Sequence, residues 1–191
     1  MKDFGLHGSI ALNMHTSRSD IDLVVYGGRN FRKLEDLIDR LVENGTLNYV
    51  FKNRIDKARR YKGRFKGKQF MFNAVRNNEE IKSKYGDFKY TPLHKVTFKC
   101  KVKDDSEAMF RPAVYNIKDY DPVNPGSELR DDLVPIVVVS MIGCYRNIAR
   151  KGDSIRVSGM LEHVQHAKTK ETFHQVVVGT GSNEEEYLWP L

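Results

Sequence analysis

The chain of 191 residues has few of the features that mark exported, membrane-spanning or disulfide-linked proteins. Its two cysteines, Cys100 and Cys144, are too few for a disulfide framework and lack the Cys-x-x-Cys spacing of metal and redox sites. We therefore expect both to be small core residues. No basic-then-apolar leader is present, and the longest apolar run, Val134–Val139, is interrupted by Pro135 and far too short to cross a bilayer. The sequence predicts a cytoplasmic protein with no membrane partner.

Several common catalytic signatures are also missing. The sequence has no Gly-x-Ser-x-Gly elbow of a serine hydrolase and no P-loop ending in Lys-Ser or Lys-Thr. His163, His166 and His174 include one spacing that zinc sites use, but no cysteine or clear fourth ligand lies near them. Ordinary histidines on the polar face of a strand are the stronger interpretation.

Hydrophobic periodicity divides the chain into a mixed first part and a β-rich second part. In the first part, Ile21–Tyr26 has the pattern of a buried strand, and apolar residues recur at helical spacing over residues 31–41. Leu47–Tyr61 suggests a second helix with a basic outer face, and Lys68–Arg76 alternates like a strand. This order predicts a small α/β domain over residues 1–88.

The second part, residues 89–191, predicts a mostly antiparallel β-barrel, of which an OB-like barrel is one form. Lys95–Lys103 alternates strictly between apolar and polar residues, as a half-exposed strand does. No amphipathic helix is evident, and the segment around Trp189 is expected to pack as a terminal plug. Four further strands are expected, separated by turn-rich stretches: Met109–Ile117, Val134–Ile142, Ser154–Val164 and Thr172–Gly179. The fold class expected for the whole chain is therefore α+β.

The net charge of +7 is concentrated in one segment. Lys52–Lys68 contains nine basic residues against Asp56 alone, and the rest of the chain is nearly balanced. Such a field attracts polyanions, including nucleotides and nucleic-acid backbones, although a solvated basic face without a ligand has the same composition. The candidate nucleic-acid contacts lie at the centre of the segment: Arg59, Arg60, Lys62 and Arg64.

The clearest chemical pattern is Gly8-Ser9 followed ten residues later by Asp20 and Asp22. Two carboxylates separated by one residue point to the same face of an extended strand, where they repel each other unless a cation lies between them. Mg²⁺ prefers such oxygen ligands and keeps other positions for water and phosphate. Gly8 and Ser9 offer backbone N–H groups and a hydroxyl without bulk, and Ser19 is a further candidate phosphate contact.

Together these residues resemble the signature of the DNA polymerase β-like nucleotidyltransferase superfamily, a Gly-Ser pair followed by an Asp-x-Asp strand. The later segments 111–117 and 152–162 are also similar to predicted archaeal nucleotidyltransferases of unknown substrate. The resemblance implies that a nucleoside triphosphate lies on Gly8 and Ser9, and that Asp20 and Asp22 are catalytic and hold Mg²⁺ or Mn²⁺. It further implies two-metal transfer of a nucleoside monophosphate to an acceptor hydroxyl, with release of pyrophosphate.

Two departures from the family pattern leave alternatives open. Members of the superfamily usually carry a third carboxylate on a later strand, and the matching strand here has Asn73, which can ligate a metal but carries no charge. Asp56 and Asp87 are other acids that would serve as a substitute. Gly8 also lies too close to the first residue for the helix that often precedes this motif, as expected of a shortened family member or of a piece of a longer chain.

Two hypotheses remain besides a Mg²⁺-dependent nucleotidyltransferase. The first is a nucleotide- or RNA-binding protein that keeps the fold with weakened catalysis, as Asn73 and the basic segment suggest. The second is an antitoxin-like minimal nucleotidyltransferase paired with a toxin, and it ranks last because such proteins are usually shorter and lack a barrel.

Overall fold

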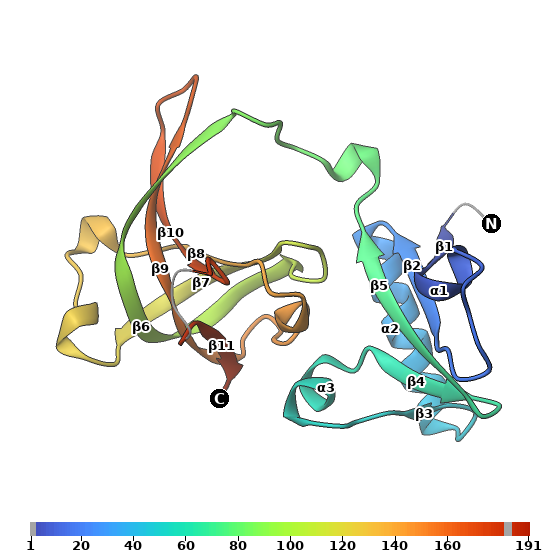
Figure 1. Ribbon diagram of the computed structural model, residues 1–191. Coiled ribbons are helices and arrows are strands. Elements are labelled where there is room, and N and C mark those ends of the chain that lie inside the picture. The colour runs from blue at the N-terminus through green and yellow to red at the C-terminus, as the bar shows by residue number, and fades with distance from the viewer. Residues whose placement is uncertain (1–2, 182–184) are drawn as a thin grey trace. The chain divides into compact units, whose positions relative to one another are not determined.

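A computed structural model describes residues 3–181 and 185–191 of the chain (Figure 1). The chain divides into two compact units, residues 1–81 and 82–191, each with its own sheet. Within the described residues, no helix combines the length and the apolar character that crossing a bilayer requires.

The first unit contains a five-stranded mixed sheet. Its strands are β1 (Phe4–His7), β2 (Ile21–Tyr26), β3 (Asn48–Tyr49), β4 (Lys62–Phe65) and β5 (Lys68–Val75), arranged in the order β1-β2-β5-β4-β3. β2 and β5 are parallel, and the other neighbouring pairs are antiparallel. The helices of this unit are α1 (Gly8–Ala11), α2 (Gly28–Glu43) and α3 (Arg54–Arg59). The two predicted strands, β2 and β5, and the predicted helix α2 are confirmed.

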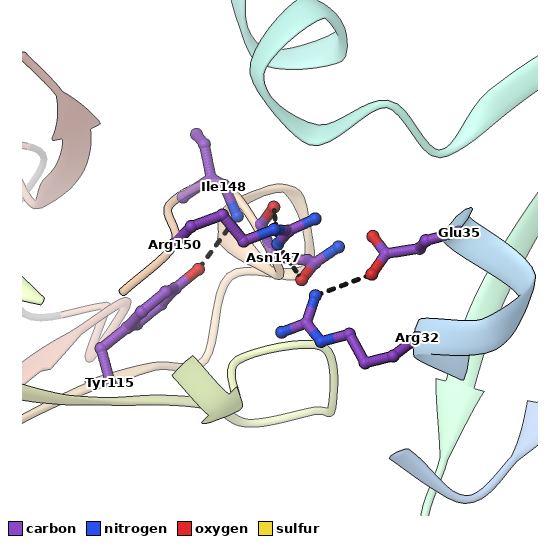
Figure 2. A network of polar contacts seen from close by, with 6 residues as sticks. All are labelled: Arg32, Glu35, Tyr115, Asn147, Ile148 and Arg150. Carbon is purple, nitrogen blue, oxygen red and sulfur yellow. Dashed lines mark hydrogen bonds and ion pairs between the residues drawn. The ribbon is translucent and has the colours of Figure 1, made fainter. Parts of the chain in front are cut away.

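α2 covers one face of this sheet because its apolar residues recur every three or four positions. Phe31 and Ile38 are buried, and the ring of Phe31 lies 5.5 Å from that of Phe72 on β5. Burial of a side chain of this size contributes about 1.5–3 kcal/mol. On the same helix, Arg32 pairs with Glu35 at 2.7 Å (Figure 2).

The helix predicted over Leu47–Tyr61 is wrong, because pairing with β4 and a local cap divide this segment. Residues 48–49 form β3 instead, which pairs with β4. The side chain of Asn53 then accepts the backbone N–H of Asp56 at 2.9 Å, so α3 begins only after Asn53. Arg60, in the left-handed conformation with φ of +51°, ends this helix after six residues.

The second unit is a six-stranded sheet in which five strands close into a ring. Its strands are β6 (Phe88–Glu107), β7 (Ala113–Pro122), β8 (Val137–Ser140), β9 (Ser154–His166), β10 (Thr172–Val178) and β11 (Tyr187–Pro190). They follow the order β10-β8-β7-β6-β9-β11, and an additional pairing of β10 with β9 closes the ring. Among the described residues of this unit, β8 and β10 pair in parallel and the other pairs are antiparallel, so the predicted mostly antiparallel character is confirmed.

The core of the second unit follows the predicted alternation along β6. Val96, Phe98, Cys100 and Val102 are all buried, as the pattern of the sequence requires. Burial raises the pKa of the Cys100 thiol to about 12, so this cysteine is a neutral core residue. Cys144 is only partly buried.

Two features of the second unit were not evident in the sequence. The last segment forms β11, which extends the sheet along β9 and buries Leu188 completely, whereas a terminal plug was expected. In addition, the buried hydroxyl of Tyr115 donates to the carbonyl of Tyr145 at 2.7 Å. The same hydroxyl accepts the N–H of Ile148 at 3.0 Å (Figure 2). These bonds fasten the loop after β8 to β7.

Candidate nucleotide and metal site

A row of polar and sulfur-containing side chains crosses the sheet of the first unit on the face opposite α2. Phe72 packs against α2, so its neighbour Met71 points to the other face. Met71 lies beside Asp22 on β2, and Asp22 lies beside His7 on β1. On the other side of Met71 lies Lys62 of β4. Residues far apart in the sequence are therefore aligned in adjacent strands around the Asp22 carboxylate.

Gly8 and Asp22 approach each other so closely that position 8 has no room for a side chain. Gly8 has φ of +68°, and a Cβ built on it would overlap Oδ2 of Asp22. Both the conformation and the contact therefore require glycine. Gly8 and Ser9 begin α1, a single turn directly after β1, so the Gly-Ser pair lies against the carboxylate, as the spacing in the sequence suggested.

Asp20 directly precedes β2, and side-chain alternation along an extended chain would carry it to the face of Asp22. The hydroxyl of Ser19, a predicted nucleotide contact, accepts the N–H of Thr16 at 2.9 Å, while Ser19 donates its own N–H to the carbonyl of Thr16 at 3.1 Å. These two bonds close the loop that leads into the carboxylate pair. Lys68 Nζ also donates to the carbonyl of Ser17 at 2.8 Å, which attaches the same loop to the start of β5.

The residues present fit one divalent cation better than two. Asp20 and Asp22 supply the charged oxygen ligands that Mg²⁺ or Mn²⁺ prefers. Within residues 3–181 and 185–191, however, no three His, Cys, Asp or Glu side chains gather closely enough to hold a metal ion. β5, where the resemblance to nucleotidyltransferases predicts a third carboxylate, contributes Met71 beside Asp22 and Asn73 beside Val24. A second ion would therefore lack a charged ligand from this strand.

Asn73, the predicted neutral metal ligand, is already hydrogen-bonded through its oxygen. Arg59 Nη2 donates to Asn73 Oδ1 at 3.2 Å, and both residues are buried. The amide nitrogen of Asn73 lies 3.4 Å from Nε2 of His7, the residue that precedes Gly8. The guanidinium of Arg59 also lies over the ring of Tyr61, with 3.6 Å between its central carbon and the ring centre. A cationic side chain thus occupies the neighbourhood in which a metal ligand was expected.

The four predicted nucleic-acid contacts lie in different environments. Arg59 is only 5% exposed and points to Asn73, so it does not contribute to the outer surface. Lys62 pairs with the buried carboxylate of Asp56 at 3.2 Å. Arg60 and Arg64 are exposed. We call the exposed basic side chains of this region the basic face: Lys52, Arg54, Lys57, Arg60, Arg64, Lys66 and Lys68.

The pair of Asp56 and Lys62 is a strongly coupled ionic contact near the site. Burial by itself raises the pKa of Asp56, but hydrogen bonds from the N–H of Lys52 and from Lys62 outweigh burial and hold this pKa below its ordinary value. Burial likewise lowers the pKa of Lys62, while bonds to Tyr61 and Asp56 more than reverse the effect and raise it. Both groups therefore stay ionised, and Asp56 is engaged with Lys62 rather than available as a third metal ligand.

The histidines considered for zinc form a pair, not a metal centre. The rings of His163 and His174 lie 5.2 Å apart on β9 and β10. His166 instead lies against Phe88, with 5.0 Å between ring centres. Burial, followed by repulsion from His163, lowers the pKa of His174, which favours the neutral ring.

Comparison with known proteins finds a family model that covers the residues of this site. Residues 2–90 match the family model described as a nucleotidyltransferase domain. Over 94% of its length, the chain is 28% identical to an uncharacterized protein of Methanocaldococcus jannaschii, and it spans 56% of that protein. No solved structure matches the chain significantly.

Proposed function

We propose that this chain transfers a nucleoside monophosphate from a nucleoside triphosphate to an acceptor hydroxyl, because residues 2–90 match the nucleotidyltransferase domain model. The single observation that carries the proposal is the contact between Gly8 and the Asp22 carboxylate. It brings a small, backbone-exposing turn against an acidic group, which is the combination that a metal-bound phosphate requires.

In this proposal Gly8, Ser9 and Ser19 bind the phosphates through N–H groups and hydroxyls, and Asp20 and Asp22 hold Mg²⁺ or Mn²⁺. The cation supplies neutralisation of the phosphate charge. The acceptor oxygen forms a bond to the α-phosphorus, the bond from this phosphorus to the bridging oxygen breaks, and pyrophosphate leaves. No carboxylate of β5 lies beside Asp22, so the proton of the acceptor passes to solvent. Catalysis then rests on positioning and charge neutralisation.

A second function, nucleotide or RNA binding with weakened catalysis, is favoured by one specific observation. The oxygen of Asn73 is bonded to Arg59, so the position of the third carboxylate carries neither a negative charge nor a proton acceptor. A fold that keeps Gly8 and Asp22 would still bind a metal-bound nucleotide. Its turnover would be low because activation of the acceptor is missing.

The acceptor is proposed to be RNA or another polyanion, held in part by the basic face. Seven exposed cations lie on or beside α3, β4 and β5, and the exposed rings of Phe51 and Phe65 lie among them in the sequence. Cations with interspersed aromatic rings suit a phosphate backbone and its bases. We also propose that the ring of five strands is an OB-like barrel, with domains 1–88 and 89–191, and that it helps to select the acceptor.

The test is transfer of label from α-³²P-labelled nucleoside triphosphates, with Mg²⁺ or Mn²⁺, to a panel of RNA, protein and small-molecule acceptors. Asp22→Asn should reduce transfer by roughly 100-fold or more, because it removes a direct metal ligand. Asp36→Asn is the matched control, since it removes the same charge from the exposed face of α2.

Transfer that is equal in the wild type and Asp22→Asn would refute the proposed site. Nucleotide binding that depends on Asp22, without transfer to any acceptor, would instead establish the second function. Calorimetric titration with each nucleoside triphosphate in the presence of Mn²⁺ separates these two results.

A further inference from the structure

Arg59 is held in a fixed orientation within the first unit. It is the last residue of α3, it stacks on Tyr61, and it donates to Asn73. A guanidinium is planar and remains charged at every relevant pH. The contact with Tyr61 and the hydrogen bond to Asn73 therefore hold a charged group in one position. This arrangement places a permanent positive charge next to the strand that the family uses for metal binding.

The orientation of Asn73 follows from this contact. Arg59 has only donors, so the side-chain atom of Asn73 that meets it must be the carbonyl oxygen. The amide NH₂ then points to His7, whose Nε2 must accept and whose proton must lie on Nδ1. Arg59 thus fixes His7, which lies beside Asp22 and immediately before Gly8.

A divalent ion at Asn73 would be disfavoured twice by this arrangement. It would have to share the oxygen of Asn73 with the guanidinium, and it would lie within a few ångströms of a charge of the same sign. Asp56, the acid on α3, is paired with Lys62. This face of the sheet therefore carries the negative charge of Asp20 and Asp22, which suits one divalent ion. The positive charge of Arg59 lies beside Asn73 of β5.

We propose that the site binds a single divalent metal ion, and that Arg59, hydrogen-bonded to Asn73, keeps a second ion away from this position of β5. The proposal rests on the proposed function in so far as Asp20 and Asp22 are taken as the ligands of the first ion. Arg59 is a positioning residue in this arrangement, because it acts through Asn73.

The experiment counts Mn²⁺ ions bound per full-length chain, from the electron paramagnetic resonance signal of free Mn²⁺ during titration. The wild type should bind one ion, and Asp22→Asn should bind none. Asn73→Asp should still bind one ion, because the new carboxylate pairs with Arg59. The double variant Arg59→Met with Asn73→Asp should bind two, because the cation is removed and a third carboxylate is present.

Two matched controls separate charge from structural damage. Arg59→Lys with Asn73→Asp keeps a cation at position 59 and should bind one ion. Lys57→Met with Asn73→Asp removes a cation from the exposed face of the same helix and should also bind one. Circular dichroism confirms that each variant is folded. Two ions bound by the wild type would refute the proposal even if Arg59→Met does not fold.

Two ions bound by the wild type would overturn the proposal, and so would one ion bound by a folded Arg59→Met and Asn73→Asp variant. These results would leave the proposed function standing. No ion bound by the wild type would count against the metal ligands of the proposed function itself, and the proposal would fall with them. Because the measurement needs no acceptor, it does not depend on finding the transfer reaction.

Discussion

Replacing Gly8 with alanine would put a methyl group where the Asp22 carboxylate lies. Two separate costs are expected. The first is conformational. Gly8 has φ of +68°, and this left-handed conformation destabilises a residue with a side chain by about 1–2 kcal/mol. The second is steric, because Oδ2 of Asp22 must rotate away from the new Cβ. A displacement to an unfavourable rotamer costs about 0.5–1.5 kcal/mol and moves a metal ligand.

Gly45→Ala is the matched control for the first cost. Gly45 has φ of +76°, and a Cβ built there meets nothing within 4 Å. Both variants should therefore be destabilised by the same conformational cost, and only Gly8→Ala should carry the steric cost as well. Urea unfolding followed by circular dichroism at 222 nm measures these losses, because the α-helices among the described residues all lie in the first unit.

Metal affinity distinguishes the two variants more sharply than stability does. Gly8→Ala should weaken Mn²⁺ binding by about tenfold or more because Asp22 is displaced. Gly45→Ala should bind Mn²⁺ like the wild type. Equal stability losses in the two variants, together with unchanged Mn²⁺ affinity in Gly8→Ala, would refute the argument that this glycine is there to admit the carboxylate.

Three further predictions concern the surroundings of the site. Asp56→Asn should lower the free energy of unfolding at pH 7 by about 2–4 kcal/mol, since it leaves the charge of Lys62 poorly compensated. Because the folded-state pKa of Asp56 is lowered, the stabilisation from its carboxylate is complete above the unfolded-state pKa of about 4 and is lost as the pH falls through the folded-state pKa. The difference in unfolding free energy between variant and wild type should therefore shrink in urea melts at acid pH. The affinity for single-stranded RNA should fall by about one log unit per log unit of salt for each phosphate neutralised. Neutralising three residues of the basic face should reduce that slope in filter-binding assays. An unchanged slope would exclude the basic face as the RNA-binding surface. Asn73→Asp should move the imidazole proton of His7 to Nε2, visible in its ¹⁵N shifts; shifts that do not change, assigned with His7→Gln, would contradict the hydrogen-bond chain from Arg59.

The strands and the acidic pair were predictable because their signals are local. An apolar run at residues 21–26 and alternation at residues 68–76 specify β2 and β5 without knowledge of the rest of the chain. Likewise, the spacing from Gly8 to Asp22 was sufficient to suggest a metal-bound nucleotide. These features depend on side-chain periodicity and residue chemistry, which a sequence displays directly.

The remaining features depend on pairings between distant segments. Sequence alone does not indicate that Met71, rather than Asn73, lies beside Asp22, since this depends on the register of β5 against β2. Composition assigned Arg59 to the basic outer surface, but α3 ends at Arg60 and leaves Arg59 directed inward. A helix was expected over residues 47–61 because a two-residue strand has too little periodicity to be recognised. The ring of the second unit closes through β9 and β10, which no local pattern shows.

The closure of that ring has a consequence for how the chain acquires its structure. β6 pairs along its length with β9, so that residue 88 lies beside residue 166, and the ring is complete only when β10 has joined both β9 and β8. Contacts between such distant segments are slow to form. The first unit has all its strands within 81 residues, and during synthesis it can fold while most of the ring is still to be made. Until residue 178 has been synthesised, β8 and β9 therefore expose unpaired strand edges and the apolar interior of the ring stays open, which makes this unit the part of the protein most prone to aggregation during folding.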